Sequence, residues 1–119
     1  MAQHNELGKI GEELAIDYLL NNGYSIVEKN YRFQKAEVDI IAKKGGVLIA
    51  VEVKTRSSIY YGNPQEFVNP KKIQLLVSAI DNYVNENDLD VEIRFDIIAV
   101  IKEQNSFKIE HIEDAFLYF

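Results

Sequence analysis

The chain has 119 residues, of which 47% are hydrophobic and 27% charged, so we expect a single domain, 1–119, with a hydrophobic core. It contains no cysteine, which excludes disulfides, thiolate metal sites and a cysteine nucleophile. The net charge is −6, no apolar run approaches the roughly 20 residues of a membrane span, and no signal-peptide pattern is visible, so we expect a cytoplasmic protein with no membrane association.

The first predicted element is a helix over residues 6–22. Its apolar residues recur at helical spacing and form one stripe: Leu7, Ile10, Leu14, Ala15, Tyr18 and Leu19. We predict Asn5 as the N-cap and Gly23 as the C-terminal stop. Gly8 and Gly11 each cost about 1 kcal/mol relative to alanine inside a helix, and we expect them to let the helix backbone approach a sheet closely.

Two neighbouring glutamates in this helix point in different directions. At helical spacing, Glu12 projects beside Gly8 and Leu19, on the flank of the apolar stripe. Glu13 projects from the outer side. Glu12 is therefore the better placed of the two to face the edge of a sheet.

Three strands are predicted next, over residues 24–33, 37–42 and 47–54. The second and third flank Gly45-Gly46, a dipeptide that strongly indicates a two-residue hairpin turn. With this turn, residues that face each other across the hairpin have numbers that sum to 91.

This register predicts a hairpin with one charged face and one apolar face. On the charged face, Asp39 lies opposite Glu52 and Glu37 lies opposite Lys54. The apolar face pairs Val38 with Val53, Ile40 with Val51 and Ala42 with Ile49. Opposed residues of an antiparallel pair have Cα atoms about 4.5–5.5 Å apart. Two carboxylates held so close repel each other unless a cation lies between them, so a divalent metal is the simplest reason for this face.

The second half of the chain predicts a loop, a helix and two strands. After the loop 57–68, Asn69-Pro70 provides an N-cap and a first-turn proline for a helix over 70–86. The strand 91–101 becomes nearly all apolar, which is typical of an inner strand buried on both faces, and 107–112 is a last short strand. The order α-β-β-β-α-β-β predicts an α/β fold with a mixed sheet, in which the third and fourth strands are parallel neighbours joined by a right-handed crossover.

Basic residues gather around the hairpin although the whole chain is acidic. The ionisable residues of segment 29–35 are all basic, and segment 53–72 holds four basic residues and one acidic residue. A helix N-terminus also favours anions, and aromatic side chains can stack on unpaired bases. We expect contacts with nucleic acid at five positions: Arg32, Arg56, Tyr61, Lys71 and Lys72. The alternatives left open are ordinary surface lysines and a tyrosine that packs within its loop.

The hairpin motif also supports a resemblance to known families. Asp39 on one strand and Glu52-Val53-Lys54 on the other resemble the site of the restriction-endonuclease-like superfamily, the PD-(D/E)xK nucleases. Further motifs extend over almost the whole chain: residues 8–20, 30–32, 37–42, 51–56, 62–64 and 94–96. With these motifs the chain is similar to the bacterial YraN family, which is uncharacterised and is assigned to the same superfamily, near Holliday-junction resolvases.

The resemblance implies metal-dependent hydrolysis of phosphodiesters, with DNA favoured over RNA as the substrate and branched DNA as a candidate. Asp39 and Glu52 carry hard oxygen ligands suited to Mg²⁺ or Mn²⁺. The Val53 carbonyl is implied as a further ligand. Lys54 lies on the same strand face as Glu52 and would orient the attacking water or stabilise charge on the phosphate.

Other charged residues have supporting roles in this hypothesis. By analogy with resolvases, Glu12 is an additional acidic site residue. We expect Glu37 to pair with Lys54 and hold it in place. Arg94 and Asp96 share one face of the fourth strand and are predicted to form a structural pair.

Alternative functions remain open from the sequence. The acidic net charge is compatible with a nucleic-acid-binding module that has the nuclease fold without cleavage. The aromatic tail 116–119 is compatible with a protein-interaction scaffold. A homodimer would suit a four-way junction, because two-fold symmetry places two sites on opposite strands. No catalytic role is predicted for His4 or His111.

Overall fold

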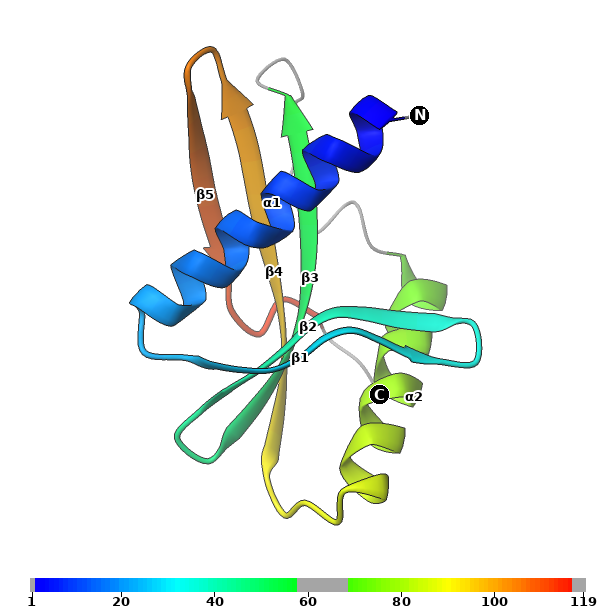
Figure 1. Ribbon diagram of the computed structural model, residues 1–119. Helices are drawn as coiled ribbons and strands as arrows, with labels where there is room; N and C mark the ends of the chain where they lie inside the picture. The colour runs from blue at the N-terminus through cyan, green and yellow to red at the C-terminus, as the bar shows by residue number, and fades with distance from the viewer. Residues whose placement is uncertain (1, 58–68, 117–119) are drawn as a thin grey trace.

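The computed structural model describes residues 2–57 and 69–116 (Figure 1). Its helices and strands, in chain order, are α1 (Ala2–Asn21), β1 (Ser25–Phe33), β2 (Ala36–Lys44), β3 (Val47–Ser57), α2 (Pro70–Glu86), β4 (Glu92–Glu103) and β5 (Ser106–Ile112). The predicted order of elements is thus confirmed. Within the described ranges, neither helix combines the length and the apolar character needed to cross a membrane.

The strands form one five-stranded mixed sheet in the order β1-β2-β3-β4-β5. Neighbouring strands are antiparallel except β3 and β4, which are parallel and joined through α2, as predicted. The inner position predicted for the fourth strand is also confirmed, because β4 lies between β3 and β5 and residues 95–100 are buried.

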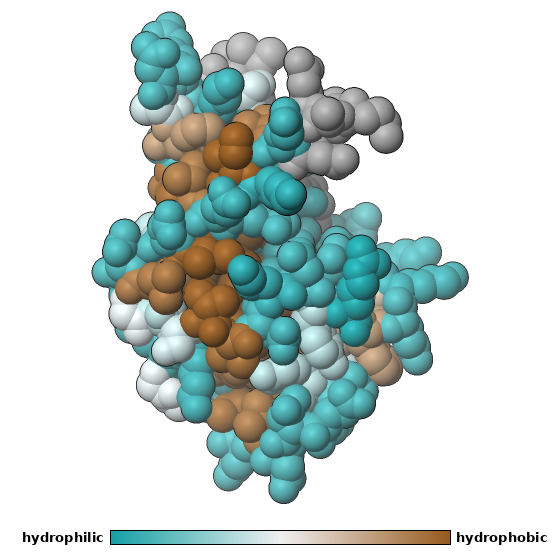
Figure 2. Space-filling model, viewed as in Figure 1, coloured by the Kyte–Doolittle hydropathy of each residue, from teal (hydrophilic) through white to brown (hydrophobic). Residues whose placement is uncertain are grey.

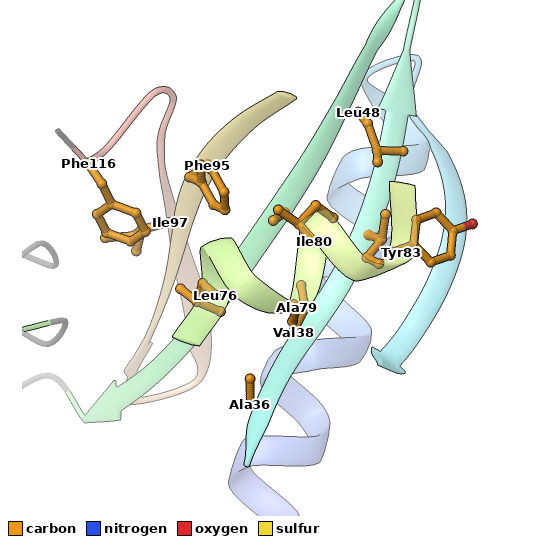
Figure 3. Close-up of a cluster of buried hydrophobic side chains, with 12 residues drawn as sticks. Ala36, Val38, Leu48, Leu76, Ala79, Ile80, Tyr83, Phe95, Ile97 and Phe116 are labelled. Carbon is orange, nitrogen blue, oxygen red and sulfur yellow. The ribbon is translucent and has the colours of Figure 1, made fainter. Parts of the chain in front are cut away.

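Each face of the sheet packs against one helix. On the α2 side, Leu76, Ala79, Ile80 and Tyr83 pack on a cluster of sheet residues that Figure 3 shows in part: Val38, Ile41, Leu48, Ala50, Phe95 and Ile97. On the other side, Ala15 and Leu19 of α1 pack on a second cluster: Ile40, Ala42, Ile49, Val51, Val53, Ile98 and Val100. Each fully buried aliphatic side chain contributes about 1.5–3 kcal/mol, so these clusters fix both helices relative to the sheet.

The two ends of α1 differ in how well the sequence predicted them. The helix begins at Ala2, so the prediction of Asn5 as its N-cap is wrong, because no glycine or proline interrupts the chain before that residue. The stop at Gly23 is confirmed. Gly23 has a φ of +87°, and the Tyr24 N–H donates to the Leu19 carbonyl at 3.0 Å. This is the hydrogen bond that closes a helix at a left-handed residue.

Close packing of α1 on the sheet requires one of its two glycines. A Cβ on Gly11 would overlap the side-chain oxygen of Thr55 on β3. A Cβ on Gly8 would meet no atom within 4 Å, so the expectation for that residue is wrong. Gly11 therefore lets the helix backbone pack against β3, and this places the neighbouring residue Glu12 close to that strand.

The start of α2 is the one predicted. The side chain of Asn69 accepts a hydrogen bond from the Lys72 N–H at 2.9 Å, and Pro70 is the first helical residue. The helix ends at Glu86, as predicted. The loop that connects β3 to this helix lies outside the described residues.

Hydrophobic surface forms only part of the face seen in Figure 2, among hydrophilic residues. Among the side chains that the structure describes, the exposed large apolar ones are Ile10, Leu20, Val27 and Phe107. Phe116, the first residue of the predicted aromatic tail, is buried, and its ring centroid lies 6.4 Å from that of Phe95. This residue belongs to the core, and the rest of the tail lies outside the described residues.

Candidate metal centre between β2 and β3

The predicted hairpin register is confirmed for the part of the ladder next to the turn. Backbone pairing runs from Lys44 with Val47 to Ile40 with Val51. The predicted pairing of Asp39 with Glu52 does not form in the backbone ladder. Beyond Ile40, β2 continues to pair with β1, whereas β3 pairs with β4 as far as Ser57. The two strands therefore part where the charged residues begin.

A side chain replaces the lost backbone pairing. The Oδ2 atom of Asp39 accepts a hydrogen bond from the Val53 N–H at 2.8 Å. The Asp39 carboxylate thus takes the position in which a ladder carbonyl would accept this donor. It remains adjacent to Glu52, although the two residues do not pair through their backbones.

The apolar face also differs from the prediction. Ile40, Ala42, Val51 and Val53 lie on the α1 side, but Val38 packs on the α2 side. Val38 thus packs on the opposite side of the sheet from Ile40, although the two residues are only two positions apart on β2. Sheet twist is the physical reason, because it rotates the faces of a strand along its length.

Glu52 is a buried carboxylate with only one of its oxygens paired. The residue is 3% exposed. Its Oε2 atom lies 3.4 Å from the Nζ atom of Lys54 and 3.4 Å from that of Lys72, the latter on α2. Its Oε1 atom is buried and has no hydrogen-bond partner among the described residues. Leaving a buried polar atom unpaired costs about 1–3 kcal/mol, and more for a charged group, so this oxygen fits a cation.

The electrostatic environment of Asp39 also favours a bound cation. Burial, followed by repulsion from Glu52, raises the pKa of Asp39 to about 7. The hydrogen bond from Val53 opposes this rise, Glu12 adds to it, and the charge of Lys72 also opposes it. Asp39 therefore interacts electrostatically with residues of both helices and of β3. A bound cation would stabilise its ionised form.

Glu12 has the orientation that its helix position predicted. It is partly buried, whereas its neighbour Glu13 is exposed. Burial raises the pKa of Glu12, and repulsion from Glu37 and Glu52 raises it further. Glu12 thus adds negative charge to the site from α1.

Two carboxylates suffice for the expected metal. Among the described residues, no three aspartate, glutamate or histidine side chains converge as a ready metal cage. Mg²⁺ keeps several water ligands and commonly binds through one or two carboxylates. The donor set of Asp39 and Glu52, with one buried oxygen unpaired, therefore fits Mg²⁺ or Mn²⁺.

The comparisons with known proteins identify the family. Residues 11–100 match the Uncharacterised protein family UPF0102. The chain belongs to this family. The match confirms the resemblance to the YraN family. Over the full length of both chains, it is 66% identical to a UPF0102 protein of Christiangramia forsetii and 65% identical to one of Flavobacterium psychrophilum. A UPF0102 protein of Phocaeicola vulgatus is 47% identical over 98% of this chain and 96% of its own.

In this UPF0102 member, the prediction that Glu37 pairs with Lys54 is wrong. Glu37 pairs with Arg32 at 3.5 Å, and Lys54 pairs with Glu52. Arg32 and Glu37 face each other directly across β1 and β2, which explains the exchange. The side chain of Arg32 is 75% exposed and remains accessible from solvent.

The remaining residues predicted to contact nucleic acid lie at different distances from the site. Lys72 reaches Glu52, whereas Lys71 is exposed and makes no ion pair within residues 2–57 and 69–116. The half-buried Arg56 donates from Nη1 to the Thr55 carbonyl at 2.8 Å. Tyr61 lies outside the described residues.

A second polar network of the UPF0102 fold involves a histidine that the sequence left unassigned. The predicted pair is confirmed, with Nη2 of Arg94 2.8 Å from Oδ2 of Asp96. His111 contacts the same oxygen through Nε2 at 2.8 Å, and its Nδ1 lies 3.0 Å from the Tyr18 hydroxyl. The sequence feature that could have predicted these partners is Asp96 within an otherwise apolar strand, because a buried carboxylate must be hydrogen-bonded.

This network keeps Asp96 ionised. Burial by itself would raise the pKa of Asp96, but hydrogen bonds from His111, Arg94 and the Asp114 backbone lower it below its usual value. Arg94, His111 and Asp114 thus share Asp96 as their common partner. The network is therefore suited to joining β4, β5 and the C-terminal segment, rather than to holding a substrate.

Proposed function

We propose that this protein is a metal-dependent nuclease of the PD-(D/E)xK type that acts on DNA, with branched DNA as the first substrate to test. The observation that carries the proposal is the unpaired, buried Oε1 atom of Glu52 beside the carboxylate of Asp39. A fold stabilised by about 5–15 kcal/mol in total rarely retains such a group without a function.

Asp39 and Glu52 would hold Mg²⁺ or Mn²⁺, with the Val53 carbonyl as a further proposed ligand. When bound, the ion would supply Lewis-acid polarisation of a phosphate oxygen and a more acidic water. The hydrogen bond from the Val53 N–H fixes the Asp39 carboxylate beside Glu52 before any ion arrives. Such preorganisation lowers the cost of binding, because few groups must move.

Lys54 is the proposed catalytic lysine. Its side chain is 24% exposed and its ammonium lies 3.4 Å from Glu52. An ammonium at the edge of a buried site can stabilise the negative charge that develops on phosphate during hydrolysis. Glu12 would contribute a further carboxylate from α1, toward water molecules around the ion.

The test begins with metal binding. In calorimetric titrations with Mn²⁺, we expect the wild type to bind, and Asp39→Asn and Glu52→Gln to bind far more weakly. Glu13→Gln removes an exposed carboxylate of α1 and serves as the control that keeps wild-type affinity. Equal binding by all four proteins would remove the proposed site.

Cleavage is then assayed on linear, flapped and four-way DNA in Mg²⁺ or Mn²⁺. We expect cleavage that is lost in Asp39→Asn, Glu52→Gln and Lys54→Met. Cleavage that survives these changes would reject the mechanism. Binding of DNA without cleavage in any metal would instead favour a non-catalytic nucleic-acid-binding module. Because the net charge is −6, such a module would have to bind DNA through local groups of basic residues.

A further inference from the structure

We infer that Lys72 is a metal-linked phosphate contact: it pairs with Glu52 in the metal-free protein and moves to a substrate phosphate when a divalent ion takes that carboxylate. This inference rests on the proposed function. The inference applies to Lys72 and not to Lys71, although the two lysines are adjacent in the sequence and carry the same charge.

The backbone of Lys72 is fixed although its side chain is long. Its N–H donates to the Asn69 side chain at 2.9 Å, in the capped first turn of α2. That turn contains no acidic residue, so two lysines stand at the positive end of a helix dipole. Glu52 offsets this unfavourable placement for Lys72 at a distance of 3.4 Å, whereas Lys71 has no such partner within the described ranges.

The charges at Glu52 explain why Lys72 would leave. One carboxylate oxygen now contacts two ammonium groups, one from β3 and one from α2. A divalent ion on the same carboxylate would add two positive charges within a few ångströms of both. The repulsion is relieved when one ammonium moves away.

Of the two lysines, Lys72 is the one free to move. Its side chain is 38% exposed, against 24% for Lys54. Lys54 also lies two residues from Glu52 on the same strand face, so its side chain starts beside that carboxylate, whereas the side chain of Lys72 reaches it from another element.

The destination is a phosphate because of what surrounds the start of α2. A helix N-terminus favours anions, and this one adjoins a carboxylate that is 3% exposed and whose Oε1 atom is unpaired within the described part of the chain. An ion on that oxygen and an ammonium released beside it would together attract one phosphodiester. Lys72 thereby links metal occupancy to DNA affinity.

The experiment compares Lys72→Met with Lys71→Met, which removes the same charge from the same helical turn. In titrations with Mn²⁺ alone, we expect Lys72→Met to bind several-fold more tightly than the wild type, because the ion no longer displaces an ammonium. We expect Lys71→Met to match the wild type. Circular dichroism melts confirm that both variants fold.

The second measurement is the affinity for a fluorescent four-way junction over a salt series, with its integrity checked on gels. In Mn²⁺, Lys72→Met should lower the slope of log K against log salt by about 0.9, the value for one phosphate contact. In EDTA it should leave the slope unchanged. Lys72→Arg should restore the slope in Mn²⁺.

The outcomes separate this inference from the function on which it rests. If the wild type binds Mn²⁺ and Lys72→Met behaves as the wild type in both measurements, the role of Lys72 is wrong and the nuclease proposal stands. If Lys72→Met weakens both metal and DNA binding and lowers the melting temperature, Lys72 is only structural. If the wild type binds no Mn²⁺, both proposals fall.

Discussion

The Oδ2 atom of Asp39 accepts the backbone N–H of Val53 at 2.8 Å, at the point where β2 and β3 separate. This hydrogen bond connects two strands beyond the end of their shared ladder, where β2 still pairs with β1 and β3 still pairs with β4. It also places the half-buried carboxylate of Asp39 next to Glu52. The site is therefore built at the end of a ladder rather than on a regular hairpin face.

Asp39 should make stability depend on pH. Its pKa in the folded protein is about 7, above the ordinary 3.8, so the folded state retains a proton that the unfolded state loses. Between about pH 4 and pH 7 the free energy of unfolding should fall as pH rises, by up to about 1.4 kcal/mol per pH unit, and level off above that window. Urea unfolding of wild type and Asp39→Asn across this pH range tests the prediction. If the free energies of unfolding of the two proteins changed with pH in the same way, the prediction would be contradicted.

Metal affinity should have the opposite pH dependence. Because Asp39 must lose its proton to bind a cation, Mn²⁺ affinity should rise by up to about tenfold per pH unit below pH 7 and level off above it. At 100 times the dissociation constant, the ion should stabilise the fold by about 2.7 kcal/mol. Thermal melts with Mn²⁺, and after EDTA is added, measure this. A melting temperature that ignores both additions would count against the site.

Gly11 and Gly8 should respond oppositely to alanine. Gly11→Ala would overlap the Thr55 side chain and should destabilise the protein by about 1–3 kcal/mol. Gly8→Ala meets no atom and should stabilise it by about 0.5–1 kcal/mol through helix propensity. Chemical denaturation gives both values. In the background of Thr55→Ala, the cost of Gly11→Ala should shrink, and an unchanged cost would show that the contact is not the cause.

Loss of Asp96 should be among the most damaging single changes. Asp96→Ala leaves Arg94 and His111 without their shared buried partner, which should cost about 3–5 kcal/mol. The exposed Asp90→Ala is the control and should change stability by less than about 0.5 kcal/mol. Equilibrium unfolding measures both, and a small effect at Asp96 would mean that the network is replaceable.

The pH dependence of the Asp96 contribution also has a defined sign. Its pKa is lowered in the folded protein, so the stabilisation is fully present above the ordinary pKa of 3.8. It is lost as pH falls through the lower folded pKa. The difference between wild type and Asp96→Ala should therefore shrink only in strong acid.

Much of the fold was predictable because its signals are local. The Gly45-Gly46 turn determined the register near the hairpin end, and Asn69-Pro70 located the start of α2. Gly23 ended α1 through a left-handed backbone, which requires no knowledge of distant residues. The N-terminal end of α1 was missed because a helix without a breaker can extend beyond any cap.

The candidate site was predictable only in part. Asp39, Glu52 and Lys54 could be grouped because strand periodicity and a short turn relate them. The partner of Glu37 was wrong because the register of β1 against β2 was unknown, and that register places Arg32 opposite Glu37.

The sequence by itself determined the order of elements, the hairpin register near its turn and which acidic residues share a region, because spacing and turn chemistry act over a few residues. The tertiary structure decided where β2 leaves β3, that Lys72 rather than Lys71 reaches Glu52, and that His111 meets Asp96. The last two contacts join residues 15 or more positions apart. They depend on sheet twist and helix packing, which only the folded chain establishes.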